Sequence, residues 1–476
     1  MREKIDDFRS ARSTITHPAT APAAPTACVR TGAACPALPG VLLTLLIGLP
    51  ALATAGCGEP DDDAALDGVS PVTGALTATA QKSPAPVGAV YTASNKYSGN
   101  EVVSFLRLAD GSLKPGPRVL TGGLGSGPGQ LIPNDPLGAQ SSLITDQERQ
   151  LLFVVNAGSN EVSSFSFDKN GLTLADRQSS KGVYPVSVTF KKDTLYVLNA
   201  ASNSITGFAV DKKGKLNRIQ TCQLPALPSL ENGFPATATQ SAQPVFSQTA
   251  GQVGFSPDGK KLVVVSKEGP LLDGFPFSPT SGNGKIHVFG VDGQGNLSDC
   301  RHPTTLVLPL NPDGKGKTPF SFTWADDGTL LVTEVFGVGT SPTKPGSAVT
   351  SYNLRNDGSL SPITQSVGNG QVAVCWIVVA GRYVYTANFL SDSISLYDDK
   401  KILTLLGGQA GLLAAGSQPS DMAITSDATL IYELASGASA IVPFAVTAKT
   451  GAPTALAPTS DGQNWTGYAG IATAEL

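Results

Sequence analysis

Short apolar runs alternate with turns rich in glycine, asparagine and aspartate along most of the chain after residue 86. The runs come in pairs, and each pair is separated by a turn or a loop. Alternating runs of this length, bounded by such turns, are typical of antiparallel β-hairpins. The seven paired runs are 90–95 with 101–105, 152–156 with 161–165, 195–199 with 204–208, 262–266 with 285–289, 330–334 with 348–352, 384–388 with 393–397, and 430–432 with 440–444.

Each pair has a further strand before it and another after it. An apolar run ending in a turn such as Ser256-Pro257-Asp258-Gly259 precedes the pair, and a glycine turn such as Asp357-Gly358 leads into the last strand. Four strands that recur every 40 to 70 residues or so match a propeller blade with loop insertions. The sequence therefore predicts an all-β fold, a seven-bladed β-propeller of four-stranded antiparallel blades over residues 87–476.

The two ends of this region indicate how the ring closes. The first repeat has no innermost strand before Val90, whereas Tyr468–Thr473 at the end of the chain resembles an innermost strand without its partners. We expect this C-terminal strand to complete the first blade. Closing the ring in this way removes exposed sheet edges.

The composition narrows the range of functions. The chain has 476 residues, a formal net charge of −4 and three histidines. No basic stripe is present, which argues against nucleic acid as a partner. There is no metal-ligand spacing, no calcium loop, no P-loop and no G-x-S-x-G motif, so no metal or cofactor is expected. We expect a monomer whose partner is a small-molecule ligand or an envelope protein.

The N-terminal 57 residues are typical of a bacterial export signal. Basic residues precede the apolar run Val41–Leu52, small residues follow, and the run is short for a membrane span. Ala55-Gly56-Cys57 resembles the end of a lipobox, which would lipidate Cys57 and tether the protein in the cell envelope. A freely secreted protein and an uncleaved signal anchor remain as alternatives. Residues 58–86 form a polar linker with too few large apolar residues to fold.

Three cysteines follow the signal segment and its linker, namely Cys222, Cys300 and Cys375. Cys222 and Cys300 occupy similar places near the ends of successive repeats. An oxidising compartment permits a disulfide between them, provided that their Cα atoms lie within about 7 Å. The sequence leaves this bond open. Cys375, next to Trp376, is expected to be a small buried core residue.

Three of the repeat motifs resemble those of a known family. Val155–Asn160, Phe255–Gly259 and Tyr385–Asn388 look like blade signatures of the lactonase-type seven-bladed propellers, which include 6-phosphogluconolactonases and carboxymuconate-cyclising enzymes. The resemblance covers about residues 87–476. It implies a hydrolase or isomerase of a small lactone or organic acid. Thr333-Glu334-Val335 is similar to the family's Asn-Glu-Leu, which makes Glu334 the candidate catalytic carboxylate.

Other positions depart from the family pattern. Thr249–Gly251 stands where the family often has His-x-His, Pro319–Ser321 where it has Pro-Arg-His, and Ser266 where it has an aspartate. A phosphorylated sugar would need an arginine or histidine to pair with its phosphate. These replacements argue against 6-phosphogluconolactone as the substrate.

The candidate site is the channel mouth, where second strands end and innermost strands begin. Opening a lactone needs an activated water and a group that holds the developing oxyanion, and Glu334 is the candidate base if burial raises its pKa. The asparagines that end second strands form either a polar ring around the mouth or Asx-turns. The candidate ligand-binding residues are Gln140, Gln252, Ser266, Lys267, Trp376, Asn388 and Asp421.

Two functions therefore stay open. The family resemblance and Glu334 favour an exported lactonase-like enzyme. The missing histidines and arginine, together with the tether after Cys57, favour a non-catalytic binding or scaffolding propeller of the cell envelope.

Overall fold

The computed structural model describes residues 84–129, 132–225, 243–244, 249–267, 283–309, 317–335 and 347–476. The chain divides into the segment Met1–Thr79 and one compact unit, Ala80–Leu476. The signal segment 1–57 with Cys57, and the linker up to residue 83, lie outside the described residues. Their roles stay predictions.

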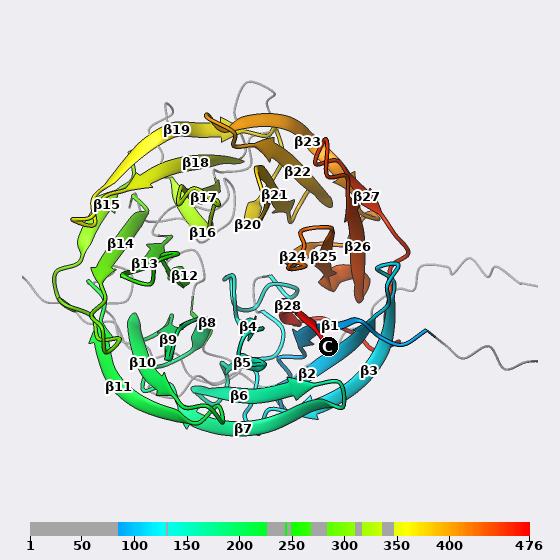
Figure 1. Ribbon diagram of the computed structural model, residues 1–476, viewed down its shortest axis with the longest axis horizontal. Helices are drawn as coiled ribbons and strands as arrows, with labels where there is room; N and C mark the ends of the chain where they lie inside the picture. The colour runs from blue at the N-terminus through cyan, green and yellow to red at the C-terminus, as the bar shows by residue number, and fades with distance from the viewer. Residues whose placement is uncertain are drawn as a thin grey trace, which may run out of the picture. The chain divides into compact units, whose positions relative to one another are not determined.

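The compact unit is a ring of seven antiparallel sheets, each with four strands (Figure 1). This confirms the propeller predicted from the sequence. We number the blades 1 to 7 from the one that contains β1. The innermost strands, in blade order, are β28 (Ala469–Glu475), β4 (Leu143–Asp146), β8 (Pro185–Lys191), β12 (Ala250–Phe255), β16 (Thr318–Trp324), β20 (Val374–Ala380) and β24 (Pro419–Ile424).

The second and third strands form the middle of each blade. The second strands are β1 (Gly88–Ala93), β5 (Leu151–Asn156), β9 (Thr194–Asn199), β13 (Lys261–Ser266), β17 (Leu330–Val335), β21 (Tyr383–Asn388) and β25 (Leu430–Ala435). The third strands are β2 (Glu101–Arg107), β6 (Glu161–Asp168), β10 (Ser204–Val210), β14 (Lys285–Gly290), β18 (Ser347–Leu354), β22 (Ser393–Asp398) and β26 (Ala440–Val446).

The fourth strands form the outer rim. They are β3 (Leu113–Leu120), β7 (Gly171–Ser179), β11 (Leu216–Gln223), β15 (Thr304–Val307), β19 (Leu360–Gly368), β23 (Thr404–Leu412) and β27 (Pro453–Ala455). A single 3-10 turn, η3 (Ser436–Ala438), interrupts the described strands.

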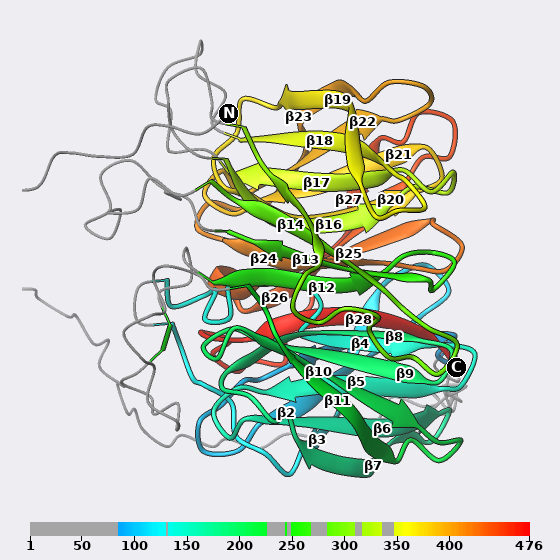
Figure 2. The ribbon, with the colours of Figure 1, turned by 90° about the vertical axis from the view of Figure 1, so that its left-hand side faces the viewer.

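Burial explains why the second strands are almost continuously apolar. In β5, Leu152 and Val154 pack toward blade 1, whereas Phe153 and Val155 pack toward blade 3. Both faces of a middle strand are therefore covered by neighbouring blades, as the edge-on view in Figure 2 shows. The rim strands have one neighbour only, and most of β7 is exposed or half-buried.

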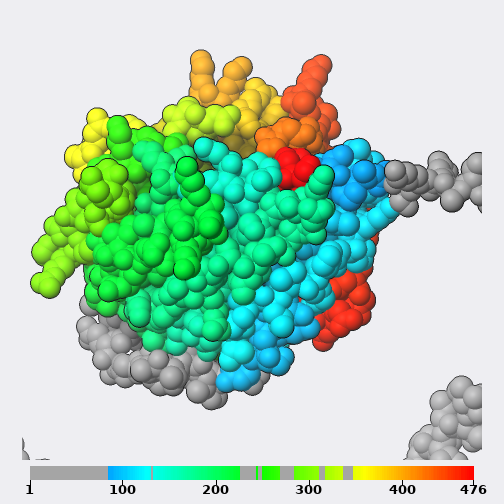
Figure 3. Space-filling view, turned by 60° about the horizontal axis from the view of Figure 1, so that its bottom comes forward, coloured from blue at the N-terminus to red at the C-terminus, as the bar shows by residue number. Residues whose placement is uncertain are grey.

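The C-terminal strand closes the ring as predicted. β28 pairs antiparallel with β1, and Thr92 donates its hydroxyl hydrogen to the Gly470 carbonyl at 2.7 Å. Figure 3 shows the red C-terminal residues beside the blue first strand. The strand begins one residue later and ends two residues later than expected, because pairing with β1 continues to Glu475.

A disulfide joins the outer parts of blades 3 and 4. Cys222 in β11 is bonded to Cys300, which precedes β15, and their Cα atoms are 5.3 Å apart. The sequence alone could not decide this bond, because it depends on how two blades approach each other. Cys375 is free and buried, as expected. No helix within the described ranges is long and apolar enough to cross a membrane.

Candidate functional site at the channel mouth

The connection between β3 and β4 runs across the middle of the ring. Figure 1 shows it as a cyan trace between blades 1 and 2 that reaches over the centre. We call residues 132–140 of this connection the mouth segment. Leu137 and Ala139 are 3% and 5% exposed, so this segment packs into the propeller and is not a free surface loop. It occupies the place where the sequence predicted a ligand-binding mouth.

Hydrogen bonds from several blades hold the mouth segment. Gln140 makes two of them with the backbone of Ile377 in blade 6, at 2.9 and 3.0 Å. The indole N–H of Trp376 donates to the Ala139 carbonyl at 3.1 Å. On the opposite side, the Tyr184 hydroxyl donates to the Pro136 carbonyl at 3.0 Å. The segment is therefore tied to both sides of the ring.

Lys267 is the cation of this buried region. It follows β13 directly, and it is fully buried. Its ammonium group donates to the Gly138 carbonyl and lies 5.1 Å from the centre of the Phe320 ring. Burial lowers the pKa of Lys267 to about 8, and the nearby Asp135 limits that decrease. Lys267 thus stays mostly protonated at neutral pH but titrates just above it.

Asp135 brings a carboxyl group into the same region from the mouth segment. Burial raises its pKa to about 7, and the charge of Lys267 opposes the rise. Asp135 also accepts a hydrogen bond from the N–H of Gly138 at 2.9 Å. This bond fixes the turn whose Gly138 carbonyl accepts the hydrogen bond from Lys267. The two groups therefore form a buried acid–base pair whose charge changes near neutral pH.

Asp421 lies next to this pair, and a further carboxyl group, Glu433, lies next to Asp421. Asp421, in β24, is 2% exposed, and burial raises its pKa well above the ordinary value, with Asp135 adding to the rise. Glu433, in β25, is fully buried, and burial followed by the charge of Asp421 raises its pKa as well. Oδ2 of Asp421 and both carboxyl oxygens of Glu433 have no hydrogen-bond partner among the described residues.

A neutral thiol lies beside this cluster, and a neutral hydroxyl directly precedes Lys267 in the chain. The Cys375 thiol is buried, and burial raises its pKa well above the usual value, so it remains a thiol and not a thiolate. Ser266 is fully buried, and its hydroxyl has no hydrogen-bond partner within the described ranges. Lys267, Asp421, Ser266, Gln140 and Trp376, all candidates from the sequence, are thus brought to the mouth or its immediate surroundings.

Glu334 lies in a different network. The hydroxyls of Thr350 and Ser366 donate to its two carboxylate oxygens at 2.9 and 2.8 Å, and the Lys317 ammonium lies 3.4 Å from Oε2. These partners belong to the third and fourth strands of the same blade and to the residue before it. Glu334 is fully buried there. Whether it serves as a base stays a prediction.

Asparagines that end second strands make hydrogen bonds that neither of the two predictions described. Asn388 is fully buried and donates to Ser395 at 3.0 Å, while Asn369 donates to its carbonyl oxygen at 3.0 Å. Asn156 makes the corresponding bond to Ser163 at 2.8 Å. Asn156 and Asn388 thus connect strands inside a blade and form neither a polar ring nor Asx-turns, whereas Asn95 bonds to Ser126 and Gly127 in the connection after β3. Thr350 and Glu334 repeat this arrangement in blade 5.

Gln252 also makes a contact between blades. Its side-chain carbonyl accepts the N–H of Phe322, in the next innermost strand, at 2.7 Å. This bond joins blades 4 and 5 beside the channel. The bond gives the side-chain oxygen of Gln252 a structural role between the two blades.

The sequence did not point to Asp135 or Glu433. Asp135 lies in an irregular connection, and only the unusual length of that connection sets it apart. Glu433 had a clearer signal, because Val154, Val197 and Val264 fill the equivalent position of other second strands. An acid among valines in a buried strand is a reason to examine a position. Within the described residues, no group of histidine, cysteine and acidic side chains could hold a metal ion.

Comparison with known proteins agrees with this architecture. The family described as "Lactonase, 7-bladed beta-propeller" matches residues 87–335. No curated protein matches the chain. Among solved structures, a periplasmic gluconolactonase of Pseudomonas aeruginosa is 16% identical with a TM-score of 0.55, covering 81% of this chain and 98% of that one.

Two further structures are similar to the same extent. A candidate 6-phosphogluconolactonase of Bacteroides fragilis is 17% identical with a TM-score of 0.53, covering 81% of this chain and 98% of that one. A protein of Lactobacillus plantarum is 13% identical with a TM-score of 0.57, covering 82% and 99%. At these identities the likeness shows the fold alone.

Proposed function

The chain belongs to the lactonase family of seven-bladed β-propellers, and on this premise we propose that it hydrolyses a small, unphosphorylated lactone at the channel mouth. The observation that carries the proposal is the buried cluster around Lys267 and Asp421. Burial lowers the pKa of Lys267 to about 8 and raises that of Asp421. Ionisable groups perturbed in this way, and converging in a mouth, are typical of sites that transfer protons.

The proposed reaction assigns a role to each group. In its ionised form, Asp421 accepts a proton as water adds to the lactone carbonyl, and the Lys267 ammonium stabilises the negative oxygen that forms. The ring C–O bond then breaks, and the leaving alkoxide receives the proton. The overall change is lactone plus water to an open-chain hydroxy acid. No cofactor takes part in it.

The substrate class follows from the charges. Lys267 is the cation that the described part of the chain contributes to the cluster, and it is already close to Asp135. A phosphate group would need additional arginine or lysine side chains to offset its two charges. We therefore propose a neutral lactone as the substrate and not a sugar phosphate.

The mouth segment places a condition on this reaction. Pro136 to Gln140 fill the space above Lys267, so a substrate reaches the cluster only when they move aside. Removing anchors should then favour the open form. We expect Trp376→Phe, which deletes the bond to Ala139, to increase kcat/KM several-fold.

A panel of lactones tests the proposal. Glucono-1,5-lactone, simple γ- and δ-lactones and 6-phosphogluconolactone are each incubated with the full chain, and acid release is followed at constant pH. We expect a neutral lactone to be opened fastest, and Lys267→Met to lower kcat by about 10²–10³. Lys401→Met, at an exposed position, is the matched control. Equal rates for the two variants, both folded by circular dichroism, would remove Lys267 from the reaction.

One observation favours a second candidate, a non-catalytic binding propeller. The mouth segment is hydrogen-bonded on both sides of the ring, so it seals the centre of the described structure. A sealed propeller would bind its partner on an outer surface. No lactone opened by either the wild type or Trp376→Phe would favour this candidate.

We also propose export to the cell envelope, with a lipid anchor at Cys57. The disulfide between Cys222 and Cys300 supports an oxidising compartment. Metabolic labelling with a radioactive fatty acid tests the anchor. We expect label on the wild type and none on Cys57→Ser, whereas labelling of both proteins would place the lipid elsewhere.

A further inference from the structure

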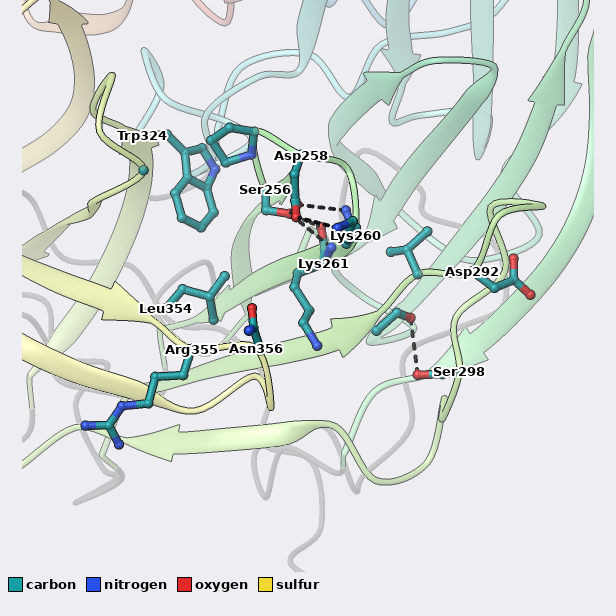
Figure 4. Close-up of a pocket in the computed structure, with 14 residues that line it drawn as sticks. Ser256, Asp258, Lys260, Lys261, Asp292, Ser298, Trp324, Leu354, Arg355 and Asn356 are labelled. Atoms are coloured by element: carbon teal, nitrogen blue, oxygen red, sulfur yellow. Dashed lines mark hydrogen bonds and ion pairs between the residues drawn. The ribbon is translucent and has the colours of Figure 1, made fainter.

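A cavity lies between blades 4 and 5, far from the mouth segment. It has a volume of about 730 Å³, which is within the usual range for small-molecule sites. Its lining comes from the turns after β12, β14, β16 and β18, at the strand ends opposite to the mouth segment. Figure 4 shows the side chains that surround it.

One wall of this cavity is apolar. Trp324, at the end of β16, and Leu354, at the end of β18, are both half-buried and pack against the core between the two blades. The Phe322 ring lies edge-on to the indole at 6.4 Å between centres, which fixes its orientation. The wall therefore offers a rigid, flat apolar surface that is partly open to solvent.

The opposite wall is polar and cationic. Figure 4 shows the Lys261 side chain extending from β13 toward Asn356, across from Trp324 and Leu354. Lys261 forms no ion pair within the described ranges. Asn356 is exposed on a turn, where its amide offers both a donor and an acceptor.

The acidic side chains around the cavity do not neutralise Lys261. Asp258 accepts the N–H of Lys260 at 3.0 Å and the Ser256 hydroxyl at 2.7 Å, and these bonds lower its pKa. Asp292 is engaged in the same way by the N–H groups of Asn296 and Gln294. Both carboxylates are therefore committed to their turns. Lys261 remains available to an anion from outside.

We propose that this cavity binds an acidic sugar, a hydroxylated ring that bears a carboxylate. The C–H face of the ring packs on Trp324 and Leu354. Its carboxylate pairs with Lys261, and a ring hydroxyl exchanges hydrogen bonds with the Asn356 amide. The opposed apolar and cationic walls select this class over a neutral sugar, which would leave Lys261 without a partner. The site is independent of the reaction proposed at the mouth.

Titration calorimetry with sodium glucuronate tests the proposal on the full chain. We expect saturable binding, and a roughly tenfold loss of affinity in Lys261→Gln, the size of one charge-assisted bond. Lys192→Gln is the matched control, because Lys192 is an exposed lysine on the neighbouring blade's turn. Glucose, which has the ring and no carboxylate, should bind at least about tenfold more weakly than glucuronate.

Tryptophan fluorescence gives a second readout at the cavity itself. Trp376 and Trp465 are fully buried, so Trp324 is the tryptophan whose emission an entering ligand changes. We expect glucuronate to shift the emission of the wild type and of Lys192→Gln. Three results would each overturn the proposal: no saturable binding of glucuronate, equal affinity in Lys261→Gln and Lys192→Gln, or glucose binding as tightly as glucuronate.

Discussion

Replacing Glu433 by valine should make the propeller more stable, and more so as the pH rises. Glu433 is fully buried without a hydrogen-bond partner among the described residues, and Val154, Val197 and Val264 occupy the equivalent position in other blades. An unsatisfied buried polar group destabilises a fold by about 1–3 kcal/mol. We expect Glu433→Val to recover an amount of this order where the carboxyl is neutral, because blades 2, 3 and 4 already accommodate valine at this position.

The pH dependence follows from the direction of the pKa shift. Burial raises the pKa of Glu433 above 4.5, its ordinary value. Between the unfolded and folded pKa values, the folded state binds more protons, so the wild type loses stability as the pH rises. The loss is at most about 1.4 kcal/mol for each pH unit in that interval. The valine variant has no such term, so its advantage grows as the pH rises above about 5.

Urea unfolding at about pH 5 and at about pH 8 measures the effect. The matched control is Thr386→Val, since Thr386 holds the equivalent position in β21 and does not titrate in this range. We expect the free-energy gain of Glu433→Val to increase with pH and that of Thr386→Val to stay constant. A gain for Glu433→Val that is the same at both pH values would refute the reasoning.

Three other predictions follow from named contacts. The Cys222–Cys300 bond closes a loop with a sequence separation of 78. By loop entropy we expect the double alanine variant to lose up to about 4.5 kcal/mol of unfolding free energy, measured in urea. Added reductant should lower the stability of the wild type as well, and a wild type that reductant leaves unchanged would contradict a formed bond. Deleting residues 469–476 removes β28 and exposes the β1 edge, so we expect a lower melting temperature by circular dichroism, and an unchanged melt would contradict ring closure. Because Lys267 acts as a cation with a pKa of about 8, kcat for lactone opening should fall as the pH rises through that value. A kcat that does not change with pH, after subtraction of spontaneous lactone opening, would count against Lys267 as the stabilising cation.

The sequence predicted the fold well because local sequence patterns determine the strands and turns of each blade. Alternation within each run, and glycine in the turns between runs, repeat in every blade, so each repeat supports the assignment of the others. The closing strand could be recognised because β1 lacked an inner neighbour and the last strand lacked every neighbour. These are properties of neighbouring residues along the chain.

The candidate site was harder to predict, because it depends on which blades meet. Lys267 and Asp421 were found from their places at strand ends, and the ring brings them near one another through Asp135. Asp135 itself arrives from the connection between blades 1 and 2, and nothing in its local sequence shows that it crosses the mouth. The network around Glu334 was hidden for the same reason, since Lys317 and Ser366 lie 17 and 32 residues away in the chain.

The most direct test compares two carboxyl variants in one lactone-opening assay. Asp421→Asn and Glu334→Gln are measured beside the wild type on the neutral lactone that the wild type opens fastest. We expect Asp421→Asn to lower kcat by about 10²–10⁴, as the loss of a general base does, and Glu334→Gln to retain most of the activity. Full activity in Asp421→Asn, with activity abolished in a folded Glu334→Gln, would contradict a mouth-centred reaction and place the chemistry at Glu334.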